Sequence, residues 1–131
     1  MSALNLQTRL LLALGAFNAA MAVAVSAAAA HLPAAQAMPM LATAATMQLV
    51  HGLGLVLIGT LALVLPRPHW MLRAGWLMAT GIALFSLNLY LRGFLDVQVF
   101  RALVPWGGTC LIASWLLLAV AVLSYRSERA R

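Results

Sequence analysis

From Leu10 to Pro66 the chain contains no aspartate, glutamate, lysine or arginine. Only 8% of its 131 residues are charged, whereas 65% are hydrophobic, and the mean hydropathy is +1.01. A water-soluble protein of this length has to cover its surface with polar groups, and this composition does not supply them. The sequence therefore predicts an all-α integral membrane protein whose solvent is mostly lipid.

The apolar runs are long enough for four membrane-spanning helices in a single domain over residues 1–131. A bilayer core about 30 Å thick requires roughly 20 apolar residues per helix, so four crossings use most of the chain. Prolines lie between the runs or at their ends, where they stop helices or begin them. We expect a four-transmembrane-helix bundle whose spans are residues 10–30, 44–65, 70–91 and 102–125.

The first span also has features of a secretory signal peptide, because a basic residue precedes an apolar run that ends among small side chains. The apolar run is longer than the usual signal core of about 7–15 residues. We therefore expect this span to be retained. Its removal would leave three spans with an unchanged orientation.

The distribution of arginine predicts the orientation of the bundle. With four crossings, only Arg92 and Arg101 fall on the side opposite the termini, with Asp96 between them, and all other arginines fall on the side of the termini. Because cytoplasmic loops carry the excess of basic residues, we expect the N and C termini to be cytoplasmic. The arginines are expected to contact anionic lipids rather than nucleic acid, since no basic cluster with interleaved aromatic residues is present.

Polar side chains gather toward the outer ends of the expected spans. This candidate polar layer consists of His31, Gln48, His51, Ser86, Asn88 and Tyr90. Gln48 and His51 are three residues apart and share one helix face, as do the serine and the tyrosine four residues apart. Interhelical hydrogen bonding is the expected role, because unsatisfied polar groups in lipid are costly. Asn18, in the middle of the first span, falls outside this layer.

Two histidines in the layer suggest a haem or metal site as an alternative. Imidazole ligates haem and transition metals, so His31 and His51 form a candidate pair of ligands. The chain has only Cys110 as a cysteine, no CxxCH motif and no third ligand beside the two histidines. We therefore expect no cofactor and no metal, and an internal disulfide is impossible.

Ionisable residues are missing from the middle of every expected span. Proton-coupled transporters and voltage sensors place such residues within the membrane, so coupled transport is disfavoured. Small residues recur at helical spacing instead, for example Gly15, Ala19 and Ala22 in the first span. This pattern is typical of closely packed membrane helices, within one bundle or against a partner protein.

Three motifs occur in order along the chain: MQLVHGL at 47–53, LFSLNLY at 84–90, and PWGG at 105–108, followed by Ser114-Trp115. Together they resemble the membrane-protein family called domain of unknown function 423. The alanine run ending at His31 is similar to the family's first-helix motif without its glycines, and Asn88 stands where the family usually has a small residue. The resemblance covers nearly the whole chain and implies a multi-pass protein of the bacterial inner (plasma) membrane with no known activity. The positions that match the family motifs are His31, Gln48, His51, Ser86 and Tyr90, together with the helix-entry motif of Pro105, Gly107, Gly108 and Trp115.

We expect the protein to be a non-enzymatic structural or accessory subunit of a larger membrane complex. The chain has no catalytic constellation, no soluble domain and no embedded carboxylate. Its expected partners are membrane lipids and other membrane-protein subunits, or further copies of itself. One alternative is a small channel or carrier with a polar vestibule in the outer leaflet. Others are the haem- or metal-binding protein and a lipid enzyme that uses Ser86 with His51.

Overall fold

The computed structural model describes residues 5–31, 38–65 and 68–125. All elements in these ranges are helical: α1 (Leu6–Ala30), α2 (Met38–Val64), α3 (His69–Ile82), η1 (Ala83–Leu87), α4 (Asn88–Leu95), η2 (Arg101–Leu103) and α5 (Val104–Leu123). The elements α3, η1 and α4 continue into one another as a single helix, which we call the third span. Four helices are thus long and apolar enough to cross a membrane. The predicted all-α, four-span architecture is confirmed.

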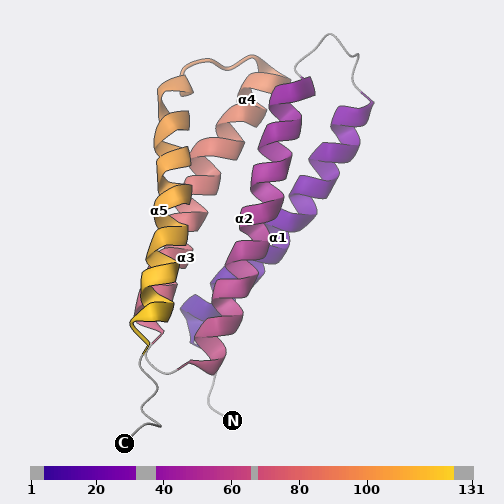
Figure 1. Ribbon diagram of the computed structural model, residues 1–131. Helices are drawn as coiled ribbons and strands as arrows, with labels where there is room; N and C mark the ends of the chain where they lie inside the picture. Colours follow the sequence, from indigo (N-terminus) through magenta and orange to yellow (C-terminus); the bar gives the residue numbers. More distant parts are fainter. Residues whose placement is uncertain (1–4, 32–37, 66–67, 126–131) are drawn as a thin grey trace, which may run out of the picture.

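The spans lie side by side as an antiparallel bundle, and the chain enters α1 and leaves α5 at the same end (Figure 1). The most extensive contacts are those of α1 with α2, of α3 with α5, and of α2 with α3. The spans differ in the share of buried residues in the most apolar stretch of each helix. This share is 44% for α2 and for the third span, and 22% for α1 and for α5. The second and third spans therefore form the centre of the bundle, and α1 and α5 flank them.

The interior of the bundle is filled by apolar side chains at the junction of α1, α2 and α3. Leu11, Leu55, Ile58 and Met78 are completely buried there. Because lipid is as apolar as these side chains, burial adds little driving force, and close packing of the backbones becomes more important. Glycines provide that close packing, and the closest approaches between backbones occur where α1 meets α2 and where α5 meets η1.

Three of the observed helices are longer than the expected spans, and α5 is shorter than the expected span of residues 102–125. α2 begins at Met38 and not near residue 44, because Pro39 fits a first helical turn, where its missing N–H would have no partner. α1 begins at Leu6, after Asn5 accepts a hydrogen bond from the backbone N–H of Gln7. The third span continues to Leu95, whereas α5 ends at Leu123. Residues 32–37, part of the expected connection, lie outside the described ranges.

A π-helical turn interrupts the third span at Ala83–Leu87. Such turns hold one extra residue and are frequent at functional sites in helices. Beyond α4, Asp96 adopts a left-handed conformation with φ of 52°, and its carboxylate accepts a hydrogen bond from the amide of Gln98 at 2.9 Å. The short helix η2 follows this turn and leads into α5.

Candidate functional site: a polar chain beside a lateral cavity

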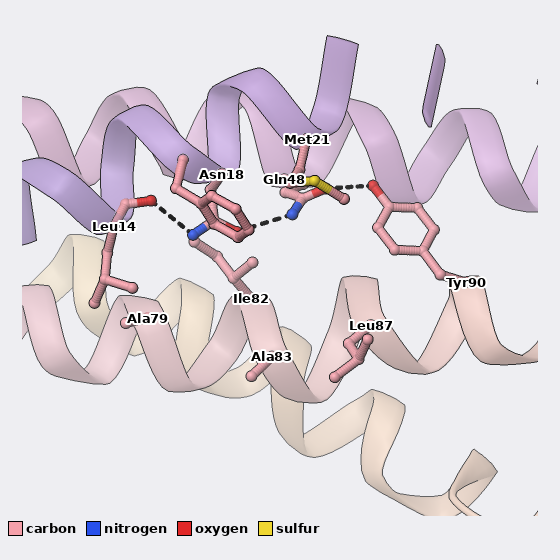
Figure 2. Close-up of a pocket in the computed structure, with 10 residues that line it drawn as sticks. Leu14, Asn18, Met21, Gln48, Ala79, Ile82, Ala83, Leu87 and Tyr90 are labelled. Carbon is pink, nitrogen blue, oxygen red and sulfur yellow. Dashed lines mark hydrogen bonds between the residues drawn. The ribbon is translucent and has the colours of Figure 1, made fainter. Parts of the chain in front are cut away.

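A chain of hydrogen bonds connects α4, α2 and α1 across the bundle. The Tyr90 hydroxyl donates to Gln48 Oε1 at 2.5 Å, and Gln48 Nε2 donates to Asn18 Oδ1 at 2.9 Å. Asn18 Nδ2 then donates to the backbone carbonyl of Leu14 at 2.8 Å. Figure 2 shows the three side chains in a row between the helices. We call this row the polar chain, and it ties three helices together within an apolar bundle.

The direction of the polar chain follows from its last acceptor, the backbone carbonyl of Leu14, which cannot donate. Asn18 therefore turns its Nδ2 toward this carbonyl and its Oδ1 toward Gln48 Nε2, which leaves Gln48 Oε1 to accept from the Tyr90 hydroxyl. A primary amide carries two N–H groups, and these bonds use one from each amide. Among the described residues, the hydrogen bonds therefore leave a second N–H on Gln48 and on Asn18. These spare groups favour a hydrogen-bond acceptor as an additional partner.

A cavity of about 400 Å³ lies beside the polar chain, between α1 and the third span. Three of its lining side chains are exposed on the flank of the bundle, to 60% at Phe17, 38% at Met21 and 54% at Leu87, so the cavity opens sideways. Few polar groups in a mostly apolar cavity of this size are typical of small-molecule sites. The lining residues are Leu14, Phe17, Asn18, Met21, Gln48, Ala79, Ile82, Ala83, Leu87 and Tyr90.

The polar chain reaches from one end of the bundle to its middle. Asn18 is the midpoint of α1, about 18 Å from either end of that helix at 1.5 Å per residue. Gln48 lies about 15 Å from the start of α2 by the same rise, and Tyr90 lies about 8 Å before the end of the third span. Asn18, which the sequence analysis placed outside the polar layer, is therefore part of the same network as Gln48 and Tyr90.

The other polar residues of the expected layer have separate partners. Ser86 Oγ donates to the backbone carbonyl of Ala44 at 3.1 Å and so joins η1 to α2. His51 Nδ1 lies 2.6 Å from the carbonyl oxygen of Met47 in its own helix. Asn88 Nδ2 donates to the carbonyl of Leu84 within the third span, and its buried Oδ1 has no partner among the described residues. The serine and the histidine are thus engaged separately.

The structure does not bring His31 and His51 together. His31 is exposed at the end of α1, whereas Gly52, next to His51, packs against Ala19. Ala19 and His31 are separated by about 18 Å of helical rise, which is too far for two imidazoles to ligate one iron. No group of three or more His, Cys, Asp or Glu residues is placed to hold a metal ion within the described ranges. The polar residues extend along the bundle instead of lying at one level.

The helix-entry motif packs α5 onto the rest of the bundle. Pro105 lies in the first turn of α5, where proline is well tolerated. Gly107 is buried against the backbone of η1, and Gly108 has more space around it. The ring of Trp115 lies 6.1 Å from that of His51, so this histidine contributes to the contact between α2 and α5.

These observations define a small four-span membrane protein whose helices are joined by buried amides and hydroxyls. The chain belongs to the family described as "Protein of unknown function (DUF423)", whose family model matches residues 25–108. The predicted family and the predicted multi-pass membrane location are confirmed.

The chain is similar over most of its length to membrane proteins of several bacteria. A UPF0382 membrane protein of Staphylococcus epidermidis is 38% identical over 117 residues, covering 86% of this chain and 93% of the relative. The UPF0382 membrane protein YwdK of Bacillus subtilis is 35% identical over 117 residues, covering 86% and 94%. A relative from Staphylococcus saprophyticus is 36% identical over 112 residues, covering 82% and 91%. No solved structure matches the chain.

Proposed function

We propose that the protein is a non-enzymatic accessory subunit of a larger membrane assembly, which docks through the outward face of α1. The observation that carries this proposal is a row of exposed alanines, spaced three or four residues apart along the helix. The row, which we call the alanine face, consists of Ala13, Ala16, Ala20, Ala24 and Ala27. At this spacing the five residues share one side of the helix.

The alanine face points away from the rest of the bundle. Leu11, Gly15 and Ala22 are buried on the side of α1 that contacts α2, about half a turn from the alanines. Small residues let helix backbones approach closely in lipid, where packing replaces the hydrophobic driving force. The alanine face is therefore suited to a helix of another membrane protein.

The outward face of α5 gives an internal comparison. Most of its exposed residues are large and apolar, with Ile112 at 65%, Leu116 at 63% and Leu123 at 83% exposure, and Ala119 is its single exposed alanine. Large side chains of this kind fill the irregular surface presented to lipid tails, whereas a flat row of methyl groups favours a neighbouring helix. α1 also exposes large side chains such as Phe17 and Val23, but only α1 has a continuous row of exposed alanines among the described residues. This difference between the two flanking helices supports a protein partner at α1 and lipid at α5.

The positions of the possible catalytic groups support a non-enzymatic role. A nucleophilic serine requires a base within hydrogen-bonding distance. Ser86 Oγ donates instead to the carbonyl of Ala44, and His51 Nδ1 contacts the carbonyl of Met47. Both side chains therefore serve the contacts between and within helices.

Replacing Ala20 by leucine tests the docking face. We expect purification of wild-type protein from native membranes in mild detergent to recover a partner at fixed stoichiometry. We expect Ala20→Leu to lower that recovery at least fivefold, because the larger side chain separates the two helix backbones. The matched control is Ala119→Leu on the exposed face of α5, which should leave recovery unchanged. Equal recovery with both variants, or a lone monomer from wild-type membranes, would contradict the proposal.

We also propose that both termini are cytoplasmic. Arg9 and Arg73 lie toward the end of the bundle where the chain enters α1, and the Arg73 guanidinium is 4.6 Å from the centre of the Trp70 ring. Arginine beside tryptophan is typical of a membrane interface. Alkaline phosphatase fused after Arg131 should be inactive, whereas a fusion after Asp96 should be active, because the enzyme matures only outside the cytoplasm. The reverse pattern would refute this orientation.

A further inference from the structure

The lateral cavity has a feature that packing of the bundle does not explain, namely a second N–H on each of Gln48 and Asn18 that has no partner among the described residues; we call these two lining residues the floor of the cavity. We propose that the cavity binds an uncharged, lipid-soluble carbonyl compound of the quinone class. Its carbonyl oxygen accepts a hydrogen bond from Gln48 or Asn18, and its hydrocarbon tail leaves the cavity between Phe17 and Leu87.

The chemistry of the floor selects a hydrogen-bond acceptor. The Leu14 carbonyl can only accept, so the amides of Asn18 and Gln48 are fixed in one orientation, and each keeps a second N–H beside a cavity that both residues line. Gln48 is itself 7% exposed and lines the cavity, which makes an unused N–H group costly unless a ligand accepts its hydrogen bond. A carbonyl oxygen satisfies this requirement, whereas a plain hydrocarbon does not.

The depth of the floor separates this ligand from ordinary membrane lipids. Asn18 is at the midpoint of α1, about 18 Å from its ends, and therefore close to the centre of a bilayer core about 30 Å thick. The charged headgroups and ester carbonyls of phospholipids lie at the interface and do not reach this level. An uncharged carbonyl ring with a hydrocarbon tail dissolves in the bilayer core and can enter the cavity from the side.

The lining of the cavity leaves room for a ring. Its wall on the third span is formed in part by Ala79 and Ala83, whose short side chains leave space opposite Phe17 of α1. α1 contacts the third span much less than it contacts α2, so the space lies between two helices that are held apart. A ring bound here would lie among Phe17, Ala79 and Ala83, all of which line the cavity.

Photoaffinity labelling of the purified full-length protein tests the proposal. The probe is an azido derivative of a short-tailed benzoquinone, and the labelled peptides are mapped by mass spectrometry. We expect labels near Phe17 and Leu87, displaced by excess decylubiquinone. Decylbenzene has the same tail but no carbonyl oxygen, so it should displace the label at least tenfold less effectively. Equal displacement by the two compounds would overturn the proposal and indicate a site for any hydrocarbon chain.

Two variants distinguish recognition of the carbonyl from simple loss of space. Gln48→Met keeps the length of the side chain but removes its N–H groups, and we expect labelling to fall fivefold to tenfold. Ala83→Leu fills the cavity and should abolish labelling, whereas Ala119→Leu, outside the cavity, should not change it. Gel filtration identifies any variant that does not fold. If Gln48→Met does not fold, Asn18→Leu, which removes the other amide, is tested in its place. Wild-type labelling in both amide variants would refute the assignment.

Discussion

Replacement of Gly107 by alanine is expected to destabilise the protein, whereas the same replacement at the adjacent Gly108 is not. A Cβ atom at Gly107 would lie 2.6 Å from the backbone nitrogen of Phe85 and 2.8 Å from the carbonyl carbon of Leu84. These are backbone atoms, so no side chain can rotate away, and α5 has to move from η1. Overpacking of this kind costs about 1–3 kcal/mol.

The adjacent glycine is a closely matched control. At Gly108 the nearest atom to an added Cβ is Phe85 Cδ2 at 3.9 Å, which is an ordinary contact. Alanine in a helix interior is more favourable than glycine by roughly 0.5–1 kcal/mol, so Gly108→Ala should raise the stability slightly. Thermal unfolding in detergent, followed by circular dichroism, compares the two variants. A midpoint for Gly107→Ala equal to or above that of Gly108→Ala would contradict the packing described for η1 and α5.

The second large effect is expected where α1 crosses α2. A Cβ atom at Gly15 would lie 2.7 Å from the carbonyl oxygen of Gly52 and 2.9 Å from the backbone nitrogen of Val56. Gly15→Ala should therefore push the two helices apart and cost about 1–3 kcal/mol. Because Asn18 is one turn further along α1, the displacement should also weaken its hydrogen bond to Gln48.

Gly59 provides the comparison within the same interface. An added Cβ there would lie 2.7 Å from both Cδ2 and Cγ of Leu12, which belong to a side chain that can change its rotamer, and 3.5 Å from the nearest backbone atom. Gly59→Ala should thus be milder than Gly15→Ala. The measurement is the detergent concentration or temperature at which each variant loses helicity. Equal losses would mean that the α1–α2 contact adapts more freely than its backbone-to-backbone geometry implies.

Much of the fold could be predicted from the sequence because lipid imposes simple requirements. Apolar runs of sufficient length indicated four spans, and the structure has four such helices. The start of α2 could not be placed well, since proline both ends helices and occupies their first turns. The π turn in the third span left no signal in composition or spacing, because it depends on how the helix packs against its neighbours.

The candidate site could be predicted only in part. Gln48 and Tyr90 were recognised as polar residues within apolar spans, and the structure joins them directly. Asn18 was not predicted to join them because contacts were expected among residues at one depth, whereas the hydrogen bonds run along the bundle from Tyr90 to the middle of α1. His51 shares a sequence motif with Gln48, but it faces Trp115 and not the polar chain. Residue types could indicate which groups need partners, whereas the choice of partner is decided by three-dimensional packing.

The π turn at Ala83–Leu87 sets the rotational phase of everything that follows it in the third span. One additional residue in a turn rotates the rest of a helix by about 100° relative to an uninterrupted α-helix. Removal of a single amino acid from this segment would swing the phenol of Tyr90 around the helix axis and away from Gln48. Gain or loss of one codon in this segment would therefore be far more disruptive than most substitutions there.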